Sequence, residues 1–239
     1  MNELICVGCG PGDPDLLTVK AVKAIKNADV IMCPTSKEGK TSIAYSIVSS
    51  VINDSKPEVV NLVFPMVKEK SILEETWKKN TKIIVDAVNS GKRVVYLTVG
   101  DPYLYSTWIY LHRELQTKYP GIKIKVIPGI VSLFTFASKV GISIAEGSET
   151  VAVIPSCYDL SRVKDTAKNC DTMIFLKDGR YFDKVVQLLK EAGFQDNSIF
   201  AIGQDLDTED EVVRKLTLGE VTKETFTNKY FSIMVVKRA

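Results

Sequence analysis

Histidine is almost absent from this chain, which has one histidine in 239 residues, and tryptophan occurs only twice. One histidine cannot build the usual zinc sites, and the Cys6-x-x-Cys9 pair lacks the second pair that would complete a cysteine site. We therefore expect no bound metal. Long apolar runs are also missing, so no segment reaches the roughly 20 residues of a membrane-spanning helix.

Excess charge of either sign is missing as well. The 31 basic and 29 acidic side chains leave a net charge of +2, which argues against a nucleic-acid partner. The five cysteines are odd in number and scattered, and the start of the chain shows no signal peptide. Both features favour reduced thiols in a cytoplasmic protein. The length of 239 residues is typical of two compact domains.

Short apolar runs alternate with helical patterns over the first half of the chain. The runs lie at residues 4–8, 29–34, 58–64, 93–100 and 122–129. Helices are expected over 18–27 and 41–52, and a third from Ser71, with a Ser71–Glu74 capping box, to near Gly91. Strands separated by helices predict an α/β layer with a mostly parallel sheet.

The second half of the chain has a different pattern. A helix is expected over 131–141, followed by strands and one further helix over 181–192. The strands are expected at residues 150–156, 172–177, 198–204, 212–218 and 230–238. Closely spaced strands favour antiparallel pairing in a second, mixed sheet. We therefore predict two α/β domains, 1–128 and 129–239.

The glycines of the first strand–loop–helix segment differ from a dinucleotide-binding fingerprint. Gly8-x-Gly10 is followed by Asp13 at the position of the third glycine, and Pro11 removes a backbone N–H from the loop. The second strand ends in Cys33-Pro34, without the acid that would bind a ribose. From these residues alone, the segment is either a ligand loop of another kind or a tight structural turn.

Two later strands also end in glycine-bearing loops. Gly100-Asp101 follows a buried strand, and Asp101 could accept hydrogen bonds from a ligand or cap a helix. Pro128-Gly129 follows another strand and precedes the hydroxyl of Ser132. Since ligands bind at the carboxyl ends of parallel strands, the three loops together predict one pocket.

The motifs "VGCGPGDPDLLT", "LTVGDPYLYST" and "VIPGIVS", in this order, resemble those of the class III, or tetrapyrrole, methyltransferase family. The segments "TMIFLK" and "SIFAIGQD" fall where that family has later motifs, so the resemblance covers the whole chain. Further features resemble one branch, the C20-methyltransferases that act on precorrin-2 or cobalt-factor II. These are "CPTSKEGKTSIAYSI", "LVFPM" and Trp77.

The resemblance implies a homodimeric enzyme of cobalamin biosynthesis, with S-adenosylmethionine (SAM) bound in a cleft between its two domains. The SAM-contacting positions that it implies are Pro11, Gly100, Asp101, Leu104, Val131, Ser132, Leu176, Lys177, Ala201 and Asp205. The family often has a methionine and a glycine at the positions of Lys177 and Asp205. Leu176 and Ala201 are equally explained as buried strand residues.

The tetrapyrrole substrate carries many carboxylates, so a basic rim is expected. Candidates for it are Lys37, Lys40, Arg113 and Arg180, although each is also explained as a solvated surface charge. Tyr103 and Tyr105 either stack on the ring or pack their own loop. No catalytic triad is recognisable, and the sequence does not identify the base that removes the meso proton.

Three alternatives stay open at this point. The chain could methylate another tetrapyrrole, as the uroporphyrinogen-III enzyme does, or a protein or ribosomal RNA, although the near-neutral charge disfavours RNA. It could also be a SAM- or tetrapyrrole-binding module without catalysis. The expected dimer has a second argument, since the apolar helix faces at 43–52 and 73–88 could exceed what one small sheet covers.

Overall fold

A computed structural model describes residues 3–52, 56–155, 159–177, 182–225 and 232–239. Its contacts divide the chain into two compact units, Met1–Val131 and Ser132–Ala239, which we call the N-terminal and C-terminal units. Within the described residues, no helix is both long and apolar enough to cross a bilayer.

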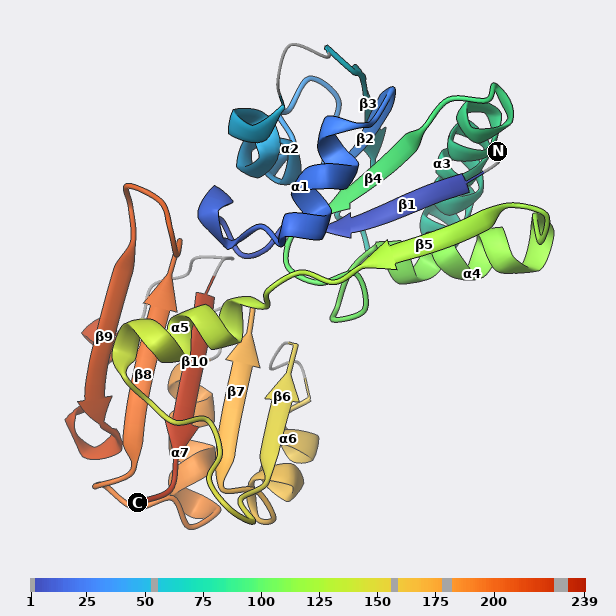
Figure 1. Cartoon of the computed structure of the whole chain (residues 1–239). Coiled ribbons are helices and arrows are strands. Elements are labelled where there is room, and N and C mark those ends of the chain that lie inside the picture. The colour runs from blue at the N-terminus through green and yellow to red at the C-terminus, as the bar shows by residue number, and fades with distance from the viewer. Residues whose placement is uncertain (1–2, 53–55, 156–158, 178–181, 226–231) are drawn as a thin grey trace. The chain divides into compact units, whose positions relative to one another are not determined.

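The N-terminal unit is built on a five-stranded parallel sheet (Figure 1). Its strands are β1 (Glu3–Gly8), β2 (Val30–Thr35), β3 (Glu58–Val63), β4 (Val94–Thr98) and β5 (Lys123–Ile127). They lie in the order β3-β2-β4-β1-β5, so β4 is the central strand. The predicted mostly parallel sheet is confirmed.

Helices cover both faces of this sheet. The helices are α1 (Val19–Lys26), α2 (Ile43–Val48), α3 (Lys70–Asn89) and α4 (Trp108–Lys118). Residues of α1 and α2 pack on one face with Ile31 and Leu97, and residues of α3 and α4 pack on the other with Met32 and Tyr96. The chain therefore leaves β4 toward one face and leaves its neighbours β1 and β2 toward the other. In open α/β sheets, ligands generally bind outside the carboxyl ends of the strands at such a reversal.

The start of α3 differs from the prediction. Glu69 occupies the N-cap position, and the Ser71 hydroxyl donates a hydrogen bond to the Glu69 carboxylate (3.2 Å) instead of capping the helix. The proposed Ser71–Glu74 capping box is therefore wrong. At the other end, Gly91 adopts a left-handed conformation (φ 82°) directly after the C-cap, as expected.

The apolar faces of α2 and α3 are largely covered within their own unit. Ile47 and Val48 pack in one core, and Ile84 and Val88 pack in the other. These faces therefore give no argument for a dimer, which stays a prediction from the family resemblance.

The C-terminal unit contains a mixed five-stranded sheet (Figure 1). Its elements are α5 (Ser132–Val140), β6 (Val151–Ile154), α6 (Leu160–Ala167), β7 (Thr172–Leu176), α7 (Phe182–Glu191), β8 (Ile199–Gln204), β9 (Val212–Thr217) and β10 (Ser232–Lys237). The strand order is β6-β7-β10-β8-β9, with antiparallel pairing from β7 to β9. The predicted fold class, two α/β units with a parallel and a mixed sheet, is confirmed.

Helix α6 was not predicted, and it connects β6 to β7. Asp159 caps the helix by accepting a hydrogen bond from the Arg162 N–H (3.1 Å), and Val163 and Ala167 are buried. Because α6 crosses from the end of β6 to the start of β7, these two strands are parallel, which makes the sheet mixed. Short 3₁₀ turns complete the fold at Pro14–Leu16, Ser49–Val51, Leu218–Glu220 and Lys223–Thr225.

Candidate functional site

The three glycine-bearing loops of the N-terminal unit meet at the carboxyl edge of its sheet. The Cys9 N–H donates to the Thr98 carbonyl (2.8 Å), and Gly10 and Gly100 exchange two backbone hydrogen bonds (3.3 and 2.7 Å). These bonds continue the β1–β4 pairing beyond the regular strands. The first and second loops are thereby fixed relative to each other.

Two glycines allow the third loop to approach the other two. A Cβ atom on Gly8 would lie 2.5 Å from the Gly129 nitrogen, and one on Gly129 would collide with the Gly100 carbonyl oxygen. Both contacts involve backbone atoms, which cannot rotate away. Gly100 differs, because its φ of 67° is left-handed and the space that a Cβ would enter is open. Glycine is therefore needed at positions 8 and 129 for the close approach of the loops, and at position 100 for the left-handed backbone.

Asp101 ties the second loop to the third. One carboxylate oxygen accepts the Tyr103 N–H (2.8 Å), and the other accepts the Gly129 N–H (3.1 Å). The carboxylate therefore orders its own loop as an Asx turn and also fixes the loop after β5. Neither of the two alternatives from the sequence foresaw this bridging role. Each carboxylate oxygen keeps further acceptor capacity for a ligand.

Buried hydroxyls close the base of the Asp101 loop. The Thr98 and Ser106 hydroxyls are 2.8 Å apart, and the Ser106 oxygen also accepts the Trp108 N–H (3.1 Å). These contacts hold the end of β4 against the start of α4. This pair was not predicted, although Ser106, two residues before a helical pattern, is a typical capping signal.

The side chains predicted to bind the tetrapyrrole are mostly exposed. Tyr103 is 52% exposed at the tip of the Asp101 loop. Lys37 and Lys40 lie on one exposed turn after β2, and Arg113 is exposed on α4. The turn and the Asp101 loop follow neighbouring strands, so they share the carboxyl edge. Arg180 lies outside the described residues.

Other predicted cofactor positions lie in the C-terminal unit. Both β7 and β8 are antiparallel to β10, so Leu176, Lys177 and Asp205 lie at one edge of that sheet. Lys177 (φ 64°) and Asp205 (φ 46°) have left-handed backbones, and burial lowers the pKa of the Lys177 amine. Left-handed backbone in non-glycine residues concentrates at functional sites, and Tyr105 (φ 53°) is a further instance.

The remaining predicted positions differ in exposure. Ala201 is fully buried inside β8, and Leu176 is 7% exposed, as expected for strand residues. Pro11, Leu104 and Val131 are half-buried in the loops of the N-terminal unit, and Ser132 begins α5.

Two of the described cysteines, Cys6 and Cys9, are in a state that does not favour metal binding. Burial raises the pKa of the Cys6 thiol well above its usual value, and it raises the pKa of Cys9 to about 12. Both thiols are therefore protonated at neutral pH, whereas metals bind the thiolate. Among the residues that the structure describes, no three His, Cys, Asp or Glu side chains are grouped to hold a metal.

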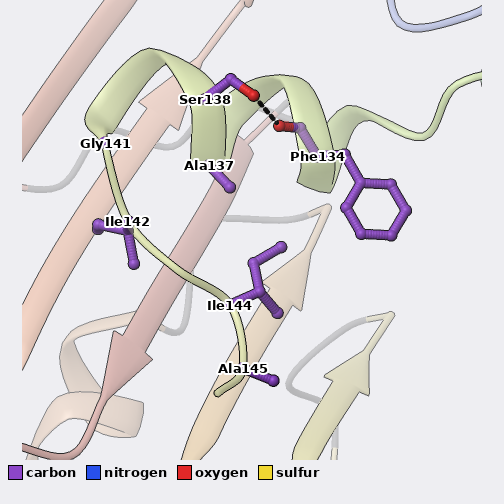
Figure 2. A pocket seen from close by; sticks show the side chains of 7 residues that line it. All are labelled: Phe134, Ala137, Ser138, Gly141, Ile142, Ile144 and Ala145. Carbon is purple, nitrogen blue, oxygen red and sulfur yellow. Dashed lines mark hydrogen bonds between the residues drawn. The ribbon is translucent and has the colours of Figure 1, made fainter. Parts of the chain in front are cut away.

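An apolar groove of about 610 Å³ lies elsewhere, along α5 of the C-terminal unit (Figure 2). It is lined by Phe134, Ala137, Ser138, Gly141, Ile142, Ile144 and Ala145. The Ser138 hydroxyl donates to the Phe134 carbonyl (3.0 Å), so the one side-chain hydroxyl of the lining is satisfied. None of the predicted site residues that the structure describes lines this groove.

The loop cluster of the N-terminal unit fits a cofactor that approaches backbone atoms closely. Such a ligand suits the open space at Gly100 and the spare acceptor capacity of Asp101. It also suits the place of these loops, where the chain leaves neighbouring strands toward opposite faces of the sheet. The fold and the loop cluster together define an α/β protein with three glycine-bearing loops grouped at the strand ends.

Comparison with known proteins identifies the family. Residues 3–222 match the family model of the Tetrapyrrole (Corrin/Porphyrin) Methylases, and this chain belongs to that family. It is a tetrapyrrole methyltransferase. Methylases of this family take their methyl group from SAM, so the predicted family and cofactor are confirmed.

Individual relatives are similar over most of the chain. A probable cobalt-precorrin-2 C(20)-methyltransferase of Methanocaldococcus jannaschii is 33% identical, covering 100% of this chain and 99% of its own length. A cobalt-precorrin-4 C(11)-methyltransferase of the same organism is also 33% identical, covering 93% of this chain and 82% of its own. The solved structure of a cobalt precorrin-4 methyltransferase has the same fold, with a TM-score of 0.78 at 20% identity, covering 99% of this chain and 95% of its own.

Proposed function

We propose that this protein methylates the meso carbon C20 of cobalt-factor II, or of precorrin-2, in cobalamin biosynthesis. The observation that carries this proposal is the full-length similarity to a probable cobalt-precorrin-2 C(20)-methyltransferase. The branch features around Lys37, Met66 and Trp77 support the same assignment. The C(11)-methyltransferase is also 33% identical to this chain, so C11 is the competing position of methylation.

Within this proposal, the glycine loops and the left-handed strand ends bind SAM, and the exposed basic and aromatic side chains bind the tetrapyrrole. Asp101 and Gly100 face the cofactor, while Lys37, Lys40 and Arg113 face the substrate carboxylates. A charge-assisted hydrogen bond from each cation favours a carboxylate over a neutral group.

The reaction requires alignment of the methyl donor and the ring carbon more than it requires a reactive side chain. SAM supplies an already activated methyl group, and the meso carbon of an electron-rich ring is a competent nucleophile. Well-oriented reactants can remove roughly 7–11 kcal/mol of a barrier through proximity alone. The loops around Asp101 hold this geometry, because hydrogen bonds fix each of them to a neighbour.

The proposal is tested with SAM labelled in its methyl group and with three acceptors: cobalt-factor II, precorrin-2 and uroporphyrinogen III. We expect transfer to one of the first two, with the label at C20 in the carbon NMR spectrum of the product. A label at C11 or at any other carbon refutes the proposed position. Binding of SAM without transfer to any acceptor would support a non-catalytic module.

Replacement of Asp101 by alanine is expected to weaken SAM binding more than tetrapyrrole binding. The change removes the acceptor of the Tyr103 and Gly129 N–H groups, so both loops lose their fixed positions. Loss of hydrogen bonds to a charged group costs about 1.5–3 kcal/mol, or a tenfold to hundredfold higher Kd. Isothermal titration calorimetry with SAM measures the effect.

Lys37→Ala is the control for this measurement. Lys37 is exposed on the turn after β2, so its loss should leave the Kd for SAM unchanged and weaken the tetrapyrrole by less than about 1 kcal/mol. An unchanged SAM affinity in a folded Asp101→Ala protein would show that the cofactor binds elsewhere.

A further inference from the structure

Four aromatic rings form a continuous column from the core of the N-terminal unit to its surface. The ring of Tyr96 on β4 lies 5.3 Å from that of Trp108, which lies 5.5 Å from His112; His112 lies 5.7 Å from Tyr103. Tyr96 and Trp108 are fully buried, His112 is half-buried, and Tyr103 is 52% exposed. The one histidine of the chain therefore lies one ring behind the surface of the Asp101 loop.

Packing fixes the direction of the imidazole. Its plane lies 29° from the plane of Trp108, four residues earlier on α4, and Tyr103 meets it edge-on at 71°. The first contact lies within one helix, but the second comes from the loop that the proposed function assigns to the two ligands. The two flanking rings hold the imidazole beside that loop.

Among the described residues, the charged groups of α4 and of the Asp101 loop are exposed or bonded to partners other than the imidazole. On α4 its neighbours in sequence are Arg113, which is exposed, and Glu114, which pairs with Lys118. In the loop, both Asp101 oxygens face backbone amides, and the phenol of Tyr96 is buried behind Trp108. Burial lowers the pKa of His112 below its ordinary value. The neutral, proton-accepting form therefore predominates at neutral pH.

We infer that His112 is the base that removes the proton from the methylated meso carbon, an inference that rests on the proposed function. In the first step the ring carbon forms a bond to the methyl group as the bond from sulfur to that methyl breaks. The carbon then carries both hydrogen and methyl, and the macrocycle is a cation. In the second step the C–H electron pair returns to the ring, and the proton passes to the unprotonated imidazole nitrogen.

The test compares the wild-type protein with His112→Phe, which keeps an aromatic ring in the column but cannot accept a proton. We expect kcat to fall about 100-fold or more, the usual contribution of general base catalysis. Substrate deuterated at C20 should show a larger isotope effect in the variant, because proton removal becomes slower than methyl transfer. In the wild type, kcat should fall at low pH with a midpoint below about pH 6.5, and this fall should disappear in the variant.

Proton NMR adds a readout that does not depend on turnover. Since the chain has one histidine, its imidazole gives one set of signals, which should shift when the tetrapyrrole binds. His112→Gln replaces His112→Phe if that protein does not fold, and Gln116→Ala, exposed on the same helix, is the matched control. Both variants of His112 should bind SAM as the wild type does.

Two results would overturn the inference. One is a fall in kcat while the isotope effect and the loss of activity at low pH stay as in the wild type, which indicates a structural role. The other is an imidazole signal that does not shift when the tetrapyrrole binds. Wild-type product that carries the new methyl group at any ring carbon other than C20 refutes the proposed function itself. The label position distinguishes that failure from a failure of His112 alone.

Discussion

Gly129→Ala is expected to destabilise the N-terminal unit by about 3 kcal/mol and to abolish measurable SAM binding. The added methyl group collides with the Gly100 carbonyl and with the backbone of Gly8, so the third loop has to move away from the other two. That movement also breaks the hydrogen bond from the Gly129 N–H to Asp101. Urea unfolding followed by tryptophan fluorescence measures the loss, because Trp77 and Trp108 both belong to this unit.

Gly121→Ala is the matched control, since a Cβ at Gly121 meets no atom within 4 Å. We expect it to change the stability by less than about 0.5 kcal/mol. Gly8→Ala should have the same effect as Gly129→Ala, and the double variant should lose less than the sum, because both methyl groups enter the same contact. Equal stability of the Gly129→Ala and Gly121→Ala proteins would disprove the close packing of the loops.

The local pattern of apolar residues in the sequence was sufficient to predict most of the fold. Each predicted strand of the first half corresponds to a strand of the parallel sheet, because buried parallel strands are continuous apolar runs. Helix α6 escaped prediction because only a few apolar residues, such as Leu160 and Val163, mark its buried side. That helix is the crossover that the parallel pair β6–β7 of the mixed sheet requires.

The site was only partly predictable. Glycines and Asp101 at strand ends are local signals, and they placed the three loops at one edge. The contact of Gly8 with Gly129 and the bond from Gly129 to Asp101 join residues far apart in sequence. They depend on the strand order β4-β1-β5, which periodicity does not encode. The place of His112 beside Tyr103 is likewise a product of tertiary packing.

Replacement of Arg238 by alanine is expected to lower the stability of the C-terminal unit by about 3 kcal/mol. Its guanidinium donates hydrogen bonds of 2.8–3.2 Å to the carbonyls of Ala167, Cys170, Ala192 and Gly193, and it lies 4.1 Å from the centre of the Phe194 ring. These carbonyls lie at or just beyond the ends of α6 and α7, where backbone acceptors lack helical partners. One cation therefore caps two helices that cover the same sheet.

The loss should appear in urea unfolding followed by circular dichroism, because both tryptophans lie in the N-terminal unit and do not report on this one. Arg214→Ala is the control, since Arg214 is exposed on β9 and its removal should cost less than about 0.5 kcal/mol. The stability of Arg238→Lys should lie between those of Arg238→Ala and Arg214→Ala. An ammonium keeps the charge but lacks the planar fork that reaches several carbonyls at once. If Arg238→Ala unfolds at the same urea concentration as Arg214→Ala, the capping of α6 and α7 contributes nothing to stability, and packing on the sheet alone holds these helices in place.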